Sequence, residues 1–490
     1  MPDWSCTRRE LIVGSVAAGA CFSFGRALAQ PSGLAGLTIE EASKLIRSRA
    51  ISSVELVRAY AERIGRFNPQ LNAFITVTED LAYEQARERD LELDSGRWRS
   101  PLHGIPVALK DNIDTAGTIT SAGSALFANR IPTEDAEVVR RLKEAGAVLL
   151  GKLNMHEFAY GATSGVSNYG PVHNPWDLNR IPGGSSGGSA AAVSARLCAA
   201  ALGTDTGGSI RQPAAYCGIV GLKPTYGLVS IRGIIPLAAS QDHVGPMCQT
   251  VADSALMLQA LAGYDPGDLA SIRSQSPDYV SALYQKTSEL KIGVARPFFF
   301  DDLDEEIEVV TEQALAVLSE LTAEISDVEL PMSRIRVVPV EAYAYHAEYL
   351  EQEETRQLYQ PPVLRRLLNG SDISATAYVE ARRELARLGR DIETVFSEVD
   401  LLITPTSPDL PITVEEGQNP PDVIATSLRN TAPFDAYGIP TISIPCGFSR
   451  EGLPIGIQIS GPHLGEANVL ALANAYEQAT DWHNQRPPLA

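Results

Sequence analysis

The sequence has few basic residues for its size: 40 lysines and arginines stand against 60 aspartates and glutamates, giving a formal charge of -20 at pH 7. Because nucleic-acid phosphates are bound by clustered cations, this balance argues against a nucleic-acid partner. None of the seven histidines has the spacing of a metal motif such as His-Glu-x-x-His, so we expect no metal and no cofactor. Internal repeats and low-complexity tails are also lacking.

Long apolar runs are scarce as well. Outside the first 30 residues none approaches the roughly 20 residues that a membrane span needs, so we expect a soluble mature protein without a membrane partner. The first residues carry, in order, a twin arginine (Arg8, Arg9), an apolar run (Leu11–Gly25) and a small-x-small sequence (Ala27-Leu28-Ala29). This order is typical of a twin-arginine export signal. We predict a signal peptide over residues 1–29 and a periplasmic or secreted protein; the alternative is a short helix that is retained.

Cysteine is sparse, and four cysteines remain after that segment: Cys198, Cys217, Cys248 and Cys446. Proteins exported by the twin-arginine route fold first in the reducing cytoplasm. A chain of this length does not need disulfides to stabilise its core. We therefore expect mostly free, buried thiols.

Helical and strand patterns alternate along the rest of the 490 residues, of which 44% are hydrophobic. Capping boxes at Thr38-x-x-Glu41 and Ser52-x-x-Glu55 predict two initial helices. Further helices are predicted from Thr133, taken as an N-cap, to Gly146, from the alanine-rich stretch to about Leu202, and near residues 303–323, 374–398 and 467–480. Strands are predicted for "IPVALKDN", for Val148 to Leu150, and for "LKIGVAR", "DLLITPTS", "TISIPCGF" and "IGIQISG". Such alternation predicts an α/β fold with helices packed over a mixed sheet.

The stretch "RIPGGSSGGSAAAVS", residues 180–194, looks like a flexible linker. It lacks the lysine of a phosphate loop, and a Pro/Asn-rich loop precedes it where a nucleophile elbow would need a strand. An apolar helix and a second loop, "LGTDTGGSIRQPAAYCG", follow at once, which argues against a linker. In this second loop Ser209 follows two glycines, Gly207 and Gly208. Paired glycines let backbone N–H groups converge on one point, as an oxyanion requires.

These loops and the lysine at the end of "GIPVALK" together resemble the amidase signature family of serine hydrolases. The matching pieces occur in the family's order from about residue 38 to the C-terminus: "PLHGIPVALKDNIDTAG", "NMHEFAYGATS", "IPGGSSGGSAAAV", "GTDTGGSIRQPAAYCGIVGLKPTYG", "LLITPTSP", "GIPTISIPCGF" and "GLPIGIQISG". The resemblance implies an α/β fold with a large central mixed sheet covered by helices on both faces. It also implies a single domain over residues 30–490, with a more variable helical region at about 300–400.

The resemblance further implies a catalytic triad of two serines and a lysine. Ser209 would be the nucleophile, Ser185 the bridging serine after a cis peptide bond, and Lys110 the base. A lysine accepts a proton only when neutral, so Lys110 should be buried and its pKa depressed well below about 10.4. We expect the backbone N–H groups of Thr206, Gly207, Gly208 and Ser209 to hold the oxyanion.

Three neighbouring residues have two interpretations each. Asp205 and Arg211 flank the second loop and either bind substrate or form an ion pair that braces the loop. Ser186 either supports Ser185 by hydrogen bonding or is a structural hydroxyl.

For an enzyme of this type, the expected reaction is hydrolysis of a small aryl or hydrophobic carboxylic amide to an acid plus ammonia or an amine, through an acyl-enzyme on Ser209. Anilide or carbamate hydrolysis uses the same triad. The family also includes the glutamine-hydrolysing subunit of the tRNA-dependent amidotransferase, whose motifs are close. Alignment from Gly438-Ile439-Pro440 places Leu428 where that subunit carries a substrate-holding acid, and export would separate the enzyme from tRNA.

A rival from a different class is an exported solute-binding protein. A binding protein has no use for a lysine and two serines in catalytic order, so we prefer the hydrolase. The expected partner is therefore a small-molecule amide, and a homodimer is left open.

Overall fold

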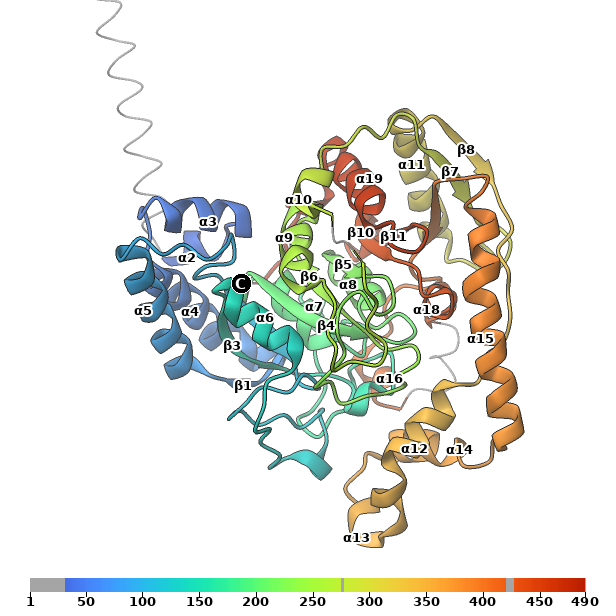
Figure 1. Ribbon diagram of the computed structural model, residues 1–490, viewed down its shortest axis with the longest axis horizontal. Coiled ribbons are helices and arrows are strands. Elements are labelled where there is room, and N and C mark those ends of the chain that lie inside the picture. Colours follow the sequence, from blue (N-terminus) through green and yellow to red (C-terminus); the bar gives the residue numbers. More distant parts are fainter. Residues whose placement is uncertain (1–30, 275–276, 420–426, 490) are drawn as a thin grey trace, which may run out of the picture.

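The computed structural model describes residues 31–274, 277–419 and 427–489, so the predicted signal peptide lies outside the described residues. One mixed sheet of 11 strands runs through the molecule in the order β1-β3-β2-β4-β6-β5-β10-β11-β9-β7-β8 (Figure 1). Its strands are β1 (Phe74–Val77), β2 (Pro106–Lys110), β3 (Val148–Leu153), β4 (Ala200–Asp205), β5 (Val220–Lys223), β6 (His243–Cys248), β7 (Lys291–Val294), β8 (Glu324–Asp327), β9 (Leu401–Pro405), β10 (Thr441–Phe448) and β11 (Pro454–Ser460). The strand predicted at Val148 thus runs three residues beyond Leu150.

The helices connect and cover these strands. They are α2 (Pro31–Leu34), α3 (Ile39–Arg47), α4 (Ser53–Leu71), α5 (Glu79–Asp94), α6 (Glu137–Ala145), α7 (Gly187–Ser194), α8 (Arg211–Cys217), α9 (Val251–Leu261), α10 (Tyr279–Ala282), α11 (Glu305–Leu321), α12 (Val338–Glu351), α13 (Glu353–Arg356), α14 (Pro361–Asn369), α15 (Ala375–Val395), α16 (Val414–Gln418), α18 (Ala432–Tyr437) and α19 (Glu466–Ala479). Three short 3-10 helices are η1 (Ala125–Phe127), η2 (Glu157–Ala159) and η3 (Trp482–Asn484). The helices predicted near 303–323, 374–398 and 467–480 are α11, α15 and α19.

Two helical layers enclose the sheet. Helices α7 and α8 contact each other and lie on one face, over the central strands. Helices α9, α11 and α19 pack together on the other face (Figure 1). Most central strands are buried along their whole length, as expected for strands covered on both sides. The predicted α/β fold with a central mixed sheet is therefore confirmed.

Helices α3 and α4 begin as the sequence predicts, although the short helix α2 precedes them. Thr38 and Ser52 are N-caps whose side chains accept from the backbone N–H groups of Glu41 and Glu55, and both capping boxes are complete. Gly146, with φ of +92°, ends α6, also as predicted.

Two predicted helix boundaries are wrong. The alanine-rich helix α7 ends at Ser194, not near Leu202, because Ala200–Asp205 forms β4 between β2 and β6. Pairing with two strands outweighs the helix propensity of alanine there. Helix α6 is capped by Ala136 and not by Thr133. Its start is fixed by a tertiary contact, since the Ala136 N–H donates to the Asp114 carbonyl at 2.9 Å.

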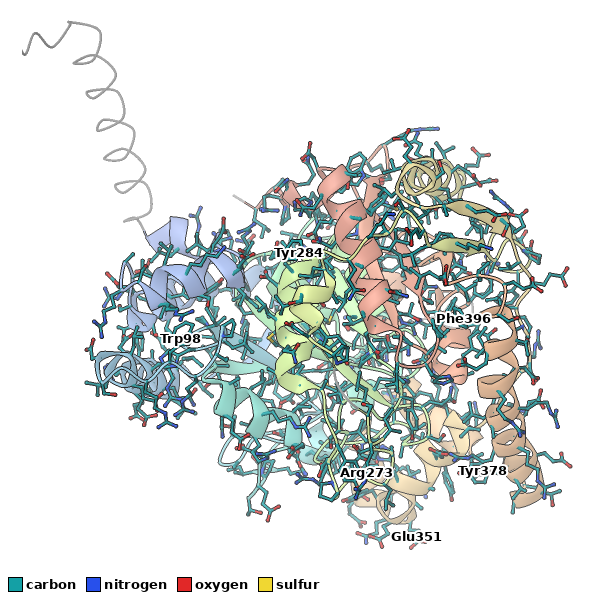
Figure 2. All side chains as sticks on the ribbon, turned by 45° about the horizontal axis from the view of Figure 1, so that its top comes forward. Trp98, Arg273, Tyr284, Glu351, Tyr378 and Phe396 are labelled. Carbon is teal, nitrogen blue, oxygen red and sulfur yellow. The ribbon has the colours of Figure 1, made fainter. Side chains whose placement is uncertain are left out.

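The region between residues 338 and 395 is mostly helical and lies at one edge of the molecule, where α12, α14 and α15 gather (Figure 1). Figure 2 labels Tyr378 on α15, beside α12. Its hydroxyl donates to Glu341 Oε1 at 2.9 Å and thereby joins these two helices. A cluster of buried apolar residues from α12 and α14 packs onto Phe127, Phe158 and Leu237 of the loops that follow central strands. We call it the aromatic cluster.

The four cysteines of the described residues are free and buried, as expected. In the same parts of the chain, no helix combines the length and apolar character that a membrane crossing requires.

Candidate active site

Lys110 is the last residue of β2, and its side chain is fully buried. Its Nζ lies 2.7 Å from Ser185 Oγ and 2.7 Å from Thr204 Oγ1. The neighbouring strand β4 runs parallel to β2, which brings Thr204 beside the lysine. Burial lowers the pKa of Lys110 to about 7, although Asp205 and Asp242 act in the opposite direction. A large share of this lysine is therefore neutral near pH 7, as a general base must be.

Ser185 follows a cis peptide bond from Gly184, the bond expected at this position. The loop is fixed on both sides of that bond. The Gly184 N–H donates to Gln212 Oε1 at 2.9 Å, and the Ser185 carbonyl accepts from the His156 N–H at 3.1 Å and from Ser164 Oγ at 3.2 Å. Ser185 is fully buried and held in place by these contacts.

The glycines of this stretch permit close approach of backbone segments. Gly183 has a φ of +81°, and a Cβ there would lie 2.9 Å from Pro213 Cα. A Cβ on Gly188 would lie 2.2 Å from the Asn154 carbonyl oxygen. Any side chain at these positions would displace a neighbouring backbone segment, so the stretch is a tightly packed loop and not a flexible linker.

Ser186 links the two glycine-serine loops. Its hydroxyl donates to the Thr204 carbonyl at 3.1 Å and accepts from the Thr204 N–H at 3.3 Å. Its own N–H donates to the Ser209 carbonyl at 3.3 Å. Because the hydroxyl bonds strand β4 and not Ser185, this geometry supports the structural interpretation of Ser186.

The second loop turns sharply between Asp205 and Arg211. The Gly208 N–H donates to Asp205 Oδ1 at 2.5 Å, so it is not available to a substrate oxygen and the expectation for Gly208 is corrected. Within the described residues, the N–H groups of Thr206, Gly207 and Ser209 have no hydrogen-bond acceptor. These three remain as the candidate oxyanion donors.

Ser209 is almost fully buried, and its Oγ has no hydrogen-bond partner among the described residues. The structure therefore joins Lys110 to Ser185 by a direct contact. It joins Ser209 to this pair through the main chain of Ser186.

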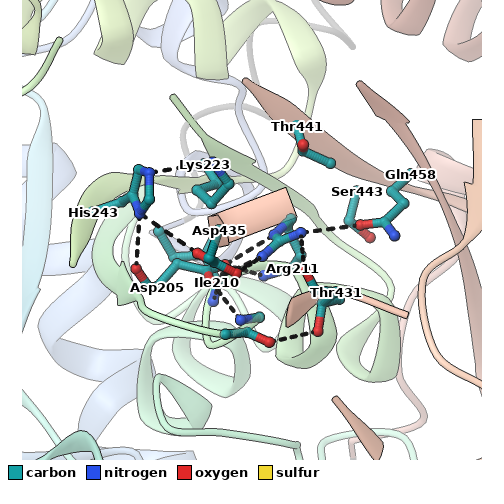
Figure 3. A network of polar contacts seen from close by, with 12 residues as sticks. Asp205, Ile210, Arg211, Lys223, His243, Thr431, Asp435, Thr441, Ser443 and Gln458 are labelled. Carbon is teal, nitrogen blue, oxygen red and sulfur yellow. Dashed lines mark hydrogen bonds and ion pairs between the residues drawn. The ribbon is translucent and has the colours of Figure 1, made fainter. Parts of the chain in front are cut away.

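Asp205 and Arg211 form a fully buried ion pair, with 3.0 Å between Nε and Oδ2 (Figure 3). Arg211 also pairs with Asp435 of α18 at 2.5 Å and donates to the Thr431 carbonyl at 2.9 Å. Burial alone would raise the pKa of Asp205, but Arg211 overrides this effect and lowers it. All polar atoms of the pair face protein groups, so this geometry supports the loop-bracing interpretation.

The same network continues to β5 and β6. Figure 3 shows Lys223 and His243 next to Asp435. Lys223 Nζ donates to the Ile439 carbonyl at 2.6 Å, and burial lowers the pKa of Lys223 to about 8. Burial and then Lys223 hold the pKa of His243 well below its usual value, so His243 is neutral. The loop that carries Ser209 is thus anchored to several strands by buried polar contacts.

Two residues of the site were missed by sequence reasoning. Thr204 accepts from Lys110, and Thr431 Oγ1 donates to the Gly207 carbonyl at 2.7 Å. Thr204 belongs to the quoted "GTDTGGS" motif, but only the strand register shows that it faces Lys110. Thr431 has no local signal, because it reaches the loop from a distant part of the chain.

Comparison with known proteins gives consistent results. The family model described as Amidase matches residues 55–470. The A subunit of the glutamyl-tRNA(Gln) amidotransferase from Moorella thermoacetica is 42% identical over 482 residues, covering 92% of this chain and 98% of that protein. The peptide amidase of Stenotrophomonas maltophilia has a similar structure, with a TM-score of 0.82, 33% identity, and coverage of 92% of this chain and 98% of that one.

The 6-aminohexanoate cyclic dimer hydrolase complexed with substrate is also similar, with a TM-score of 0.84, 29% identity, and coverage of 92% of this chain and 98% of that one. The family match covers most of the chain, and the motifs that contain Lys110, Ser185 and Ser209 meet in one buried site. The chain therefore belongs to the amidase signature family, whose members are hydrolases of carbon–nitrogen amide bonds.

Proposed function

We propose that the protein hydrolyses a small, apolar carboxylic amide through an acyl-enzyme on Ser209. The observation that carries this proposal is the contact of 2.7 Å between the buried Lys110 Nζ and Ser185 Oγ, next to the Ser209 loop. Neutral Lys110 accepts the proton of Ser185, and Ser185 accepts that of Ser209 as the Ser209 oxygen attacks the carbonyl carbon.

The attack forms a carbon–oxygen bond and places a negative charge on the former carbonyl oxygen. The unoccupied N–H groups of Thr206, Gly207 and Ser209 are the donors for this oxyanion. When the carbon–nitrogen bond breaks, the leaving nitrogen takes a proton from Ser185, which regains one from protonated Lys110. Water then attacks the acyl-enzyme by the same route and releases the acid, so the lysine ends each turnover neutral.

The choice of an apolar amide rests on Leu428. Its Cδ1 and Cδ2 lie 3.9 Å and 3.1 Å from the positions that Cβ atoms would occupy on Gly207 and Gly208. A branched alkyl side chain therefore covers the loop of the candidate oxyanion donors. The family resemblance puts an acid that holds glutamine at this position in the amidotransferase, and an alkyl group cannot bind an ammonium ion in its place.

The aromatic cluster supports the same choice from another side. The Phe127 and Phe158 rings meet edge to face at a centroid distance of 5.4 Å, and His346 packs on Phe158 at 4.4 Å. Leu237 of this cluster donates its N–H to Asp242, which in turn accepts from Thr206 Oγ1 at 2.5 Å. The segment that carries Leu237 is thus connected to Thr206 of the catalytic loop through Asp242, while Leu428 covers this loop at Gly207 and Gly208. Anilides and carbamates with aromatic groups fit the same surroundings.

A second candidate is glutamine hydrolysis within an amidotransferase-like complex. The relative from Moorella thermoacetica favours it, because that protein is 42% identical and carries the amidotransferase name. In that case the chain would act with partner proteins. Leu428 argues against this candidate, and a substrate panel decides between them.

The experiment measures turnover of glutamine, aryl amides, anilides and carbamates by the purified protein and by Ser209→Ala. We expect aryl amide turnover and labelling by a fluorophosphonate probe, both lost in Ser209→Ala. Leu428→Asp should lower the kcat/KM for apolar amides about tenfold or more, whereas the similarly shaped Leu428→Asn should keep more of it because it carries no charge. Glutamine turnover that exceeds aryl amide turnover in the wild type would favour the second candidate. A protein that neither turns over amides nor reacts with the probe would contradict both.

We also propose export by the twin-arginine route, on the strength of Arg8 and Arg9 and the apolar run behind them. Arg8→Lys/Arg9→Lys should leave the enzyme in the cytoplasm with normal activity in cell lysates. Equal periplasmic activity of this variant and the wild type would refute the proposed route.

A further inference from the structure

A cleft of about 500 Å³ lies at the end of α7 that points away from Ser185 and is lined by four arginines, Arg63, Arg66, Arg196 and Arg486. It forms where α4, the end of α7 and the C-terminal segment meet. Figure 1 marks the C-terminal end beside the N-terminal helices, in agreement with this arrangement. Helix α7 begins two residues after Ser185 and ends at this cleft, so the catalytic site and the cleft lie at opposite ends of one helix.

The four arginines lack direct ion-pair partners among the described residues, although the chain has 60 acidic and only 40 basic residues. Within the described residues, none of the four forms an ion pair with a carboxylate. Other arginines of the protein, such as Arg140 and Arg232, do pair with acids in this way. Glu41 and Asp253 act on Arg196 only from beyond ion-pair distance. Four neighbouring guanidinium groups that lack a directly paired carboxylate can therefore accept an added counter-charge.

Backbone contacts hold several of these guanidinium groups in place. Arg63 donates from Nε to the Arg196 carbonyl at 3.1 Å and from Nη2 to the Ala195 carbonyl at 2.8 Å. Arg196 donates from Nη1 to the Gly36 carbonyl, and its Nε is buried without a partner. Arg63 and Arg66 both lie over the Phe67 ring, at 4.8 Å from its centroid. Fixed guanidinium groups with spare N–H donors are suited to binding an oxyanion.

The electrostatics of the cleft point the same way. Burial and then the charge of Arg196 lower the pKa of Arg486 to about 10. The pKa of Arg63 is lowered by burial first and then by Arg196 and Arg66. The guanidinium groups therefore repel one another, and a bound anion would remove this repulsion.

We propose that this cleft binds a small multivalent oxyanion of the phosphate class, held by Arg63, Arg66, Arg196 and Arg486. Phosphate oxygens accept several N–H groups at once, which matches a cleft whose donors come from α4, from Arg196 two residues after α7, and from the C-terminal segment. Free phosphate and a phosphate-bearing metabolite share this chemistry. The site is separate from the amide-hydrolysing centre, so it does not depend on the proposed substrate.

Calorimetric titration of the purified full chain with inorganic phosphate and with pyrophosphate, at low ionic strength, tests the proposal. We expect saturable binding by the wild type, and at least about tenfold weaker binding by Arg66→Gln/Arg486→Gln, which loses two charge-assisted contacts. These two arginines are exposed, so the variant should fold normally. Tighter binding of pyrophosphate than of phosphate would indicate a phosphate-bearing molecule as the natural ligand, and the reverse order free phosphate.

Arg58→Gln is the matched control, because Arg58 is an exposed arginine of the same helix α4 that does not line the cleft. It should bind both anions like the wild type. A second arm repeats the titration on a chain extended by two glycines after Ala490. Because Leu489 lines the cleft, this variant tests whether the end of the chain competes with the anion. Absence of binding by the wild type, equal binding by the double variant, or binding that appears only in the extended chain would each overturn the proposal.

Discussion

At the scale of single residues, Lys110 sets the pH range in which the proposed base works. Burial lowers its pKa to about 7, so the neutral fraction rises from about a tenth at pH 6 to about nine tenths at pH 8. We expect kcat/KM for an uncharged amide to rise about tenfold over this interval and then to level off. Lys110→Ala should lower kcat by about a thousandfold or more at pH 7, measured by amine release.

A neighbouring residue provides the control for this pH profile. Thr204 Oγ1 accepts from Lys110 Nζ at 2.7 Å and so stabilises the ammonium form. Thr204→Val removes that acceptor and should move the rising limb to lower pH, whereas Thr204→Ser should keep it in place. A profile that is flat between pH 6 and 8, or one that Thr204→Val leaves unmoved, would contradict the assignment of the base.

At the scale of elements, the segment that leads into α18 and the loop before Ser209 act as one unit. Thr431 Oγ1 donates to the Gly207 carbonyl. A Cβ on Gly208 would lie only 2.0 Å from Thr431 Oγ1. Thr431→Val keeps the shape but leaves a carbonyl without its donor, at a cost of about 1–3 kcal/mol. We expect kcat to fall about tenfold with little change in KM, because the oxyanion donors are displaced while the apolar surroundings persist.

Thr431→Ser keeps the hydroxyl and should restore most of kcat. A rise in KM of the same size as the expected fall in kcat would instead show that Thr431 acts on substrate binding. Steady-state kinetics of the two variants on one aryl amide separate these outcomes.

Elements also show what the sequence could and could not predict. Strand β2, the two capping boxes and the glycine-serine loops follow from local patterns, and the resemblance places Ser185 and Lys110 in one site, where their side chains are 2.7 Å apart. The end of α7 was wrong because sheet pairing of Ala200–Asp205 is a non-local effect. The hydrogen bond from the Gly208 N–H to Asp205 depends on the geometry of a turn, which no local sequence motif predicts.

Contacts between residues distant in the sequence could not be predicted either, because they too depend on how the chain folds. Arg211 and Asp435 are 224 positions apart, and their contact joins α8 to α18. The ion pair of Asp205 and Arg211 was open to prediction, since the two residues are close in sequence. Asp435, the second acid that pairs with Arg211, is distant in the sequence, and only the folded structure shows this contact.

At the scale of the whole molecule, buried carboxyl groups tie the N-terminal helices to the rest of the fold. Asp253 of α9 is fully buried and accepts from the Ile39 N–H at the start of α3 at 2.9 Å. Burial raises the pKa of Asp253 to about 7, so the folded protein retains a proton that the unfolded chain releases near pH 4. The free energy of unfolding contributed by this group therefore falls as pH rises from about 4 through 7, because the folded state binds more protons in that window.

Asp253→Asn isolates this contribution, since it keeps the shape and an oxygen acceptor but cannot ionise. We expect the difference in melting temperature, wild type minus variant, to be larger at pH 5 than at pH 8, measured by calorimetry. Titrating groups that do not interact with Asp253, including the buried histidines, are common to both proteins and cancel in this difference. The pKa of Glu477 is raised by burial first and also by the charge of Asp253, so its contribution changes the difference in the same direction as that of Asp253. A difference that stays constant or grows towards pH 8 would mean that Asp253 is ionised in the folded protein. The link between α9 and α3 would then be a charge-assisted bond that strengthens the fold at high pH.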